Sequence, residues 1–325
     1  MRSLLSDTPA NVCIASVAFH PITRSTHVSH HQKRVLVTGA NKGIGLAIVS
    51  AALEADDNVA IFLGARNPVR GKTAREDLLA RHPEWAGRLY ALTLDIADDA
   101  SVENAAMEIA SRYLDDPHPL YAVVNNAGIG SEAGDMRAVL NVNVHGMHRV
   151  CEAFIPLLDQ RSGRVVNVAS ASGPMFLARC RADIQTALTR ADITWTEIEN
   201  IMNRCLALEA QGGDFEAQGF ANGSSYGLSK ACVNAYTINL ARSYPAMRIN
   251  SCTPGYIETD MTRPFATASG SAPDEMGMKP AAEGARAPLH LLLGDVGTGW
   301  YYGSDAVRSP LDRYRGPGEP AYEPK

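Results

Sequence analysis

Short apolar runs alternate with segments of helical spacing along the chain from Lys33 onward. Runs rich in Val, Ile and Leu predict strands, and apolar residues three or four positions apart predict helices. The predicted strands cover residues 34–38, 59–63, 89–94, 121–124, 164–168 and 247–252. The predicted helices cover residues 44–53, 69–81, 98–113, 136–158, 226–244 and 281–293. Because the strands are apolar throughout, we expect an α/β fold with a doubly wound parallel sheet that helices cover on both faces.

The alternation stops between residues 171 and 222, where the pattern is mixed. Helical stretches lie around residues 181–189 and 196–210 within this segment. No Gly/Ser-rich linker marks a second domain. We therefore expect a single domain over residues 33–308, with an inserted helical segment at about 171–222.

Both ends of the chain differ in composition from the middle. Residues 1–32 form an N-terminal extension rich in Ser and Thr, for which disorder, organellar import and a wrongly chosen start codon are open interpretations. Residues 309–325 form a C-terminal tail rich in Pro, Gly and charge, and residues 299–303 could add an edge strand.

Composition and charge exclude several classes of function. The net charge of −5 argues against a nucleic-acid binder, which would carry a basic field. No apolar run approaches the roughly 20 residues that cross a bilayer, so we expect no membrane partner. The six cysteines include no Cys-x-x-Cys pair, which favours buried thiols and a cytoplasmic location over disulfides or zinc. His145 and His148 have a spacing that permits metal binding, but no carboxylate or Cys completes a site, and we predict none.

A glycine-rich turn, Thr38-Gly39-Ala40-Asn41-Lys42-Gly43-Ile44-Gly45, joins the first predicted strand to the first helix. Gly39 permits a tight turn, Gly43 lets the backbone approach a phosphate, and Gly45 allows close packing of helix on strand. The start of the helix offers N–H groups and a positive dipole to a pyrophosphate. The turn therefore predicts dinucleotide binding on a Rossmann-type sheet, with a purely structural turn as the alternative. The expected cofactor contacts are Gly39, Asn41, Lys42, Gly43, Ile44 and Gly45.

The end of the second strand indicates which dinucleotide binds. An NAD site usually has a carboxylate there, which accepts hydrogen bonds from the ribose. This chain has Ala65-Arg66-Asn67 instead, and the Arg66 guanidinium is suited to a 2′-phosphate. Lys42 can add a second positive charge. We therefore expect NADPH, the alternative being that both side chains are solvated surface cations.

The next two strand ends supply further expected cofactor contacts. Asp95 and Ile96 end the third strand, where they are placed to meet the adenine. Asn126, Ala127 and Gly128 follow the fourth strand, and their small size would let the chain run beside the cofactor. A purely structural role remains open for the preceding residue, Asn125.

Candidate chemistry lies further along the chain. Tyr226 and Lys230 are spaced i and i+4, on one face of one predicted helix. A free tyrosine has a pKa of about 10, and a nearby cation lowers it, so that the phenol can act as general acid toward a carbonyl oxygen. Ser170 ends the fifth strand and can donate a hydrogen bond to that oxygen, although a turn or cap role is an alternative.

Asn143 lies inside the long predicted helix, in the stretch Asn143-Val144-His145-Gly146. Asn and Gly are poor residues for the middle of a helix, and such a conflict often marks a functional or strained site. We assign Asn143 to holding a water that relays protons to Lys230.

Together these motifs resemble the short-chain dehydrogenase/reductase family over residues 33–293. Asn143, Ser170, Tyr226 and Lys230 match the family's catalytic tetrad. The family's nicotinamide-contacting turn is matched by Pro254, Gly255, Ile257 and Thr259.

Ser170 and Tyr226 are 56 residues apart, which is wide for the family and similar to its monomeric carbonyl reductases. That resemblance implies reduction of ketones, aldehydes and quinones by hydride transfer from NADPH, with Lys230 lowering the pKa of Tyr226 and binding the nicotinamide ribose. It also implies that the insert covers a helix face used elsewhere for oligomerisation, which leaves the chain a monomer. The residues that could line the substrate pocket are Met175, Phe176, Trp195 and Phe265.

Two alternatives are kept open. The first is an NAD-dependent secondary-alcohol or hydroxysteroid dehydrogenase, which Arg66 opposes. The second is a non-catalytic NADPH-binding sensor, which would not need the Tyr, Lys, Ser and Asn set.

Overall fold

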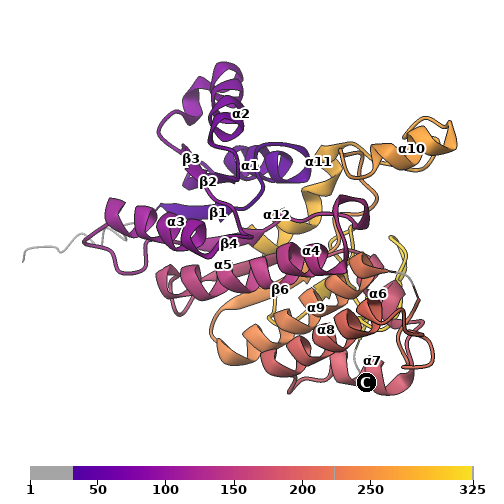
Figure 1. Cartoon of the computed structure of the whole chain (residues 1–325). Helices are drawn as coiled ribbons and strands as arrows, with labels where there is room; N and C mark the ends of the chain where they lie inside the picture. The colour runs from indigo at the N-terminus through magenta and orange to yellow at the C-terminus, as the bar shows by residue number, and fades with distance from the viewer. Residues whose placement is uncertain (1–31, 223, 324–325) are drawn as a thin grey trace, which may run out of the picture. The chain divides into compact units, whose positions relative to one another are not determined.

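The computed structural model describes residues 32–222 and 224–323, which belong to one compact unit that begins at Gln32. Apart from that residue, the predicted N-terminal extension lies outside the described residues. The described strands form one sheet in the order β3-β2-β1-β4-β5-β6-β7-β8 (Figure 1). They are β1 (Lys33–Val37), β2 (Val59–Ala65), β3 (Leu89–Thr93), β4 (Ala122–Asn125), β5 (Arg164–Val168), β6 (Arg248–Cys252), β7 (Tyr301–Tyr302) and β8 (Arg308–Ser309).

The six predicted strands are confirmed, and the pairs from β3 through β7 are parallel. The strand order reverses at β1 and β4, which creates the crevice where such sheets bind ligands. The edge of the sheet differs from our expectation. The predicted edge strand is β7, and β8, from the start of the tail, pairs with it in antiparallel fashion. A tight turn at Gly303–Ala306 allows this, since Gly303 N donates to Val307 O and Ala306 has a φ of 63°.

The helices are α1 (Gly43–Ala55), α2 (Pro68–Arg81), α3 (Asp99–Arg112), α4 (Met136–Leu140), α5 (Gly146–Phe154), α6 (Ser172–Leu177), α7 (Ala182–Thr189), α8 (Trp195–Ala210), α9 (Ser225–Ser243), α10 (Arg263–Ser269), α11 (Ala281–Gly284) and α12 (Arg286–Leu293). The helix predicted over 281–293 is broken at Ala285. The pattern did not predict α6 and α10, which have six and seven residues and each contain a proline. Helices this short show too few turns for a period to be recognised.

Alternating side chains of each strand face opposite layers of helices. Val35 and Val37 of β1 pack in one cluster with α1, α2 and α12. Leu36, between them, packs in the other cluster with α3, α5, α8 and α9. The doubly wound sheet is thus covered on both faces, as the apolar strands predict.

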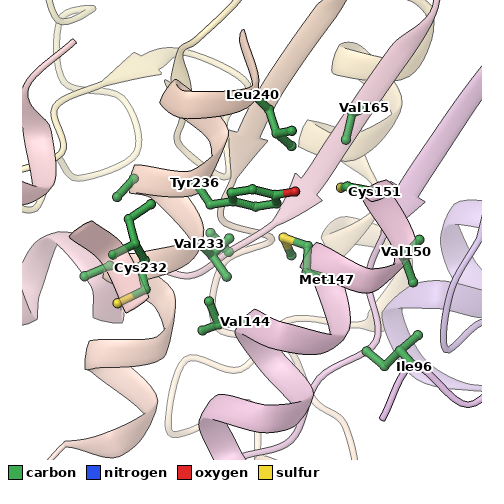
Figure 2. Packing of buried hydrophobic residues seen from close by; sticks show 14 of the residues in the cluster. Ile96, Val144, Met147, Val150, Cys151, Val165, Cys232, Val233, Tyr236 and Leu240 are labelled. Carbon is green, nitrogen blue, oxygen red and sulfur yellow. The ribbon is translucent and has the colours of Figure 1, made fainter. Parts of the chain in front are cut away.

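Tyr236 of α9 lies at the centre of the second cluster, with its hydroxyl directed toward Cys151 of α5 (Figure 2). Burial raises the pKa of Tyr236, and burial raises the pKa of the Cys151 thiol to about 12. All five described cysteines are free and buried. This packing fixes α9, the helix that carries Tyr226 and Lys230.

The insert packs on α9. Ile184 and Leu188 of α7 and Ile198 and Met202 of α8 are buried in the same cluster. Trp195, which we expected in the substrate pocket, is placed elsewhere. Its ring stacks on His148 with 3.9 Å between ring centroids and lies 5.2 Å from the Tyr236 ring. Tyr236 is ten residues beyond Tyr226, about 15 Å along the helix, so the pocket assignment of Trp195 is wrong.

Two features are absent from the described residues. None of their helices is long and apolar enough to cross a membrane. Nor do they bring three or more His, Cys, Asp or Glu side chains together in a group that could hold a metal ion.

Candidate active site

The glycine-rich turn and the end of β4 form one closely packed unit. Gly39 has a φ of 61°, and a Cβ added there would lie 2.9 Å from the Ala127 Cα atom. A Cβ on Gly45 would lie 2.5 Å from Nδ2 of Asn126, which donates to the carbonyls of Thr38 (3.0 Å) and Gly39 (3.2 Å). Asn126 and Ala127, expected as cofactor neighbours, therefore also shape the turn.

Thr38 supplies a contact that the sequence analysis missed. Its hydroxyl oxygen accepts hydrogen bonds from the backbone N–H groups of Asn126 and Ala127, each at 3.0 Å. The only signal in the sequence was its place directly before the glycines. By contrast, Asn125 has a structural role, since its Nδ2 donates to Oδ1 of Asn167 on the next strand at 2.9 Å.

The start of α1 fits a pyrophosphate group. No described side chain caps its N-terminus. The other long helices near the sheet have such caps, from Asn67 on α2, Asp98 on α3, Thr194 on α8 and Ser224 on α9. Gly43, its first residue, has a φ of 56° and no side chain over the turn. Free N–H groups at a helix start, beside a backbone with no side chains, suit an anion.

The two cations expected near a 2′-phosphate differ in their surroundings. Arg66 is exposed at the end of β2 and forms no ion pair with the described residues. Lys42 Nζ instead lies 2.5 Å from Oδ2 of Asp260, whose pKa is lowered by that hydrogen bond. The second charge expected from Lys42 is therefore already compensated by a carboxylate.

The residues after β3 are held by local contacts. Asp95 Oδ1 accepts a hydrogen bond from the Ala97 N–H at 3.0 Å, so the carboxylate closes its own turn. Ile96 is buried, and a Cβ on Gly146 would lie 2.8 Å from its carbonyl oxygen. Gly146 is thus required where α5 crosses the end of β3.

Asn143 lies in a π-helical turn, Asn141–His145, between α4 and α5. Its Oδ1 accepts from Ile129 N at 2.8 Å, and its Nδ2 donates to Ile129 O at 2.9 Å and to Ser229 Oγ at 3.0 Å. The buried amide therefore joins the loop after β4 to α9. The sequence showed a conflict here between a helical pattern and residues that disfavour a helix, and the structure departs from α-helical geometry at this position.

Lys230 is buried beneath this junction. Its Nζ donates to the carbonyl oxygen of Val168, the last residue of β5, at 3.0 Å. A Cβ on Gly128 would lie 3.7 Å from Lys230 Nζ and 3.1 Å from Asn143 Oδ1, so these two groups flank one glycine. Burial lowers the pKa of Lys230 to about 8.

Tyr226 lies above Lys230, whose Nζ is 5.5 Å from the centre of the phenol ring. Burial raises the pKa of Tyr226, and a hydrogen bond with the Ser170 side chain opposes that rise only in part. Our expectation of a pKa lowered by Lys230 is therefore wrong for this structure. The physical reason is that the phenol loses solvent, and this effect outweighs the hydrogen bond with Ser170.

Ser170 contacts both Tyr226 and the turn that follows β5. Its hydroxyl interacts with Tyr226, and its oxygen also accepts from Ser172 N at 3.2 Å. The fifth strand and α9 thus bring two hydroxyl groups together at the carboxyl end of the sheet, with an ammonium beneath them.

The segment after β6 lies over the glycine-rich turn. Gly255, after Pro254, has a φ of 94°, and Ile257 is buried. The Thr259 Cγ2 atom lies 3.5 Å from where a Cβ on Gly43 would stand. The matched nicotinamide turn and the expected pyrophosphate site are therefore neighbours.

Tyr301 is a second tyrosine near Tyr226 that the sequence analysis did not single out. Burial raises the pKa of Tyr301, while a hydrogen bond with Thr253 lowers it, and its phenol interacts electrostatically with Tyr226 and Tyr314. The sequence offered one signal for this position, because neighbouring residues of a strand face opposite sides of the sheet. Tyr301 packs in the cluster with α9, and Tyr302 packs in the opposite cluster.

A fold with this strand order and a phenol, hydroxyl and ammonium at its crevice defines a nucleotide-dependent oxidoreductase class. Comparison with known proteins agrees. A family model described as short chain dehydrogenase matches residues 33–181. The chain is 32% identical over 271 residues to carbonyl reductase [NADPH] 1 of Mus musculus and 30% identical over 284 residues to (+)-neomenthol dehydrogenase of Arabidopsis thaliana. Each match covers 79% of this chain and 90% of the relative.

A solved structure, menthone neomenthol reductase from Mentha piperita, matches with a TM-score of 0.67 and 26% identity, covering 84% of this chain and 99% of that one. The chain therefore belongs to the short-chain dehydrogenase/reductase family and is an oxidoreductase.

Proposed function

We propose that this enzyme reduces ketones, aldehydes or quinones with NADPH. The observation that carries the proposal is the meeting of the Tyr226 and Ser170 hydroxyls at the sheet's carboxyl end, above buried Lys230. Further support comes from relatives named as a carbonyl reductase and a neomenthol dehydrogenase.

NADPH is proposed over NADH because of Arg66. A carboxylate at the end of β2 would accept hydrogen bonds from an NADH ribose, whereas an exposed guanidinium favours a 2′-phosphate. The uncapped start of α1 would hold the pyrophosphate, and the small residues 126–128 would border the cofactor. The carbonyl reductase relative named with NADPH supports the same choice.

When bound, the nicotinamide supplies a hydride to the carbonyl carbon. Tyr226 donates a proton to the carbonyl oxygen, and Ser170 donates a hydrogen bond to it. The pKa of Tyr226 is raised, so its phenol is protonated at neutral pH and holds the proton to be donated. Lys230 would bind the nicotinamide ribose, and Asn143 would hold a water that returns a proton through Lys230.

The test uses purified full-length protein, a panel of carbonyl compounds, and NADPH absorbance. We expect turnover with NADPH to exceed turnover with NADH. Tyr226→Phe should lose at least about a hundredfold in kcat, the usual scale of a general acid, while still binding NADPH in a fluorescence titration.

The matched control is Tyr90→Phe, on edge strand β3, which removes a phenol hydroxyl that donates to Gly87 O. It should turn over at the wild-type rate. Full activity in Tyr226→Phe would overturn the assigned proton donor. A preference for NADH and for alcohol oxidation would favour the secondary-alcohol dehydrogenase instead.

A further inference from the structure

The C-terminal segment, residues 303–323, folds back beside the carboxyl end of β6. A Cβ on Gly255 would lie 3.1 Å from the Ser304 Cβ atom, so the segment touches the turn after β6 directly. Leu311 packs against the hydrophobic cluster that contains α9. The segment therefore runs on the same side of the sheet as Tyr226.

A buried ion pair fixes this segment. Arg315 Nη2 lies 2.6 Å from Asp305 Oδ2, and the two side chains are 5% and 13% exposed. The Gly318 N–H donates to the same carboxylate at 2.9 Å. Burial acts to raise the pKa of Asp305, but this hydrogen bond and the Arg315 charge together lower it, so the pair stays ionised. An exposed tail would not need such a pair, because desolvating two charges is costly.

The fixed segment shares a cavity with the turn after β6. This cavity has a volume of about 230 Å³, and its lining includes residues 254–256 from the turn and Ser304, Tyr314 and Pro317 from the C-terminal segment. The turn after β6 continues to Thr259, whose Cγ2 atom lies 3.5 Å from where a Cβ on Gly43 would stand. The cavity therefore borders the segment that lies over the expected cofactor site.

Two exposed aromatic side chains lie at this cavity. Among the described residues, seven large hydrophobic side chains are exposed, and Tyr256 and Tyr314 are two of them. Tyr256 and Tyr314 are 40% and 53% exposed and line the same cavity. Exposed apolar surface beside a crevice is typical of a ligand-binding surface, and aromatic rings favour flat partners.

We propose that Tyr314 is a specificity-determining residue, and that the C-terminal segment forms a wall of the substrate crevice. Tyr314 and Tyr256 pack on the flat body of bulky ring-containing carbonyl compounds. Small acyclic aldehydes do not extend to this wall. Arg315 and Asp305 are positioning residues, because they hold the wall without touching the substrate. This proposal rests on the proposed carbonyl reduction.

The test compares the wild type with Tyr314→Ala, Tyr314→Phe and Tyr322→Ala, using menadione as the bulky carbonyl and propanal as the small one. Tyr314→Ala should raise KM for menadione about tenfold, the scale of one lost aromatic contact. Its kcat, its kcat/KM for propanal and its Kd for NADPH should stay within about twofold of wild type. Tyr314→Phe keeps the ring and should have the wild-type KM for menadione.

Tyr322→Ala is the matched control, because Tyr322 lies in the same segment but does not line the shared cavity. This variant should have the wild-type KM and kcat for both substrates. If Tyr314→Ala does not fold, Tyr314→Leu keeps apolar volume without the flat ring and should give the same rise in KM.

Three outcomes of Tyr314→Ala would overturn the proposal: an unchanged KM for menadione, an equal fall in kcat/KM for menadione and propanal, or weaker binding of NADPH. A wild-type protein that reduces neither carbonyl would instead contradict the proposed function itself, and the specificity proposal with it.

Discussion

Lys230 combines a charge with nearly complete burial, being 5% exposed. Loss of solvent lowers the pKa of its ammonium to about 8. A lysine in water would remain charged well above that pH. The free enzyme therefore loses a charge at its site just above neutrality.

This residue predicts an alkaline limb in the pH profile. Lys230 is protonated below its pKa and neutral above it, so kcat/KM for NADPH should fall as pH rises through about 8. Lys230→Arg should have lower activity throughout, but its residual activity should not fall in this range, since Arg stays protonated. Initial rates from about pH 6 to about pH 10 check this. If kcat/KM fell in the same way in the wild type and in Lys230→Arg, the alkaline limb would belong to another group.

At the scale of elements, the π-helical turn Asn141–His145 explains why a polar residue is buried in the middle of a helix. It directs the Asn143 amide at both backbone groups of Ile129 and at Ser229. Ser229 in turn donates to the Tyr226 carbonyl at 2.8 Å. One amide thus couples the loop after β4 to the helix that carries the proposed acid.

Replacing that amide should lower the stability of the protein. Asn143→Leu keeps the size of the side chain but leaves several buried polar groups without partners, which we expect to lower the free energy of unfolding by about 3 kcal/mol. Urea denaturation followed by circular dichroism measures the loss. Asn239→Leu is the control, because Asn239 Nδ2 donates one hydrogen bond, to Ile193 O. Equal stability of the two variants would contradict the role assigned to Asn143.

At the scale of the whole molecule, the insert decides which surface of α9 remains open. The buried residues of α7 and α8 pack on α9, the helix face that the family resemblance connects with oligomerisation. A surface covered from within the chain is not available to a second copy.

We therefore predict a monomer. The full chain should show a mass of 34.8 kDa in light scattering coupled to gel filtration. This mass should not change with protein concentration, because no self-association is coupled to it. A dimer mass that grows with concentration would show that another surface mediates assembly.

Much of the fold could be predicted because strands and helices are specified by local periodicity. The six parallel strands and the helix over 226–244 follow from neighbours within a few residues. The short helices α6 and α10 lack that periodicity and were missed. Ser170, Tyr226 and Lys230 could be proposed because they occupy a strand end and one helix face, positions that the element pattern places at one edge of the sheet. Asn143 could be proposed because Asn is a poor residue for the middle of a helix.

The sequence by itself determined the order of the elements and the residues at the crevice. Only the tertiary structure decided the environment of those residues: the raised pKa of Tyr226, the contact of Lys42 with Asp260, the position of Trp195 and the wall built from residues 303–323. Lys42 and Asp260 are 218 residues apart. Burial and such distant contacts depend on how whole elements pack, and a local pattern of apolar and polar residues does not record that packing.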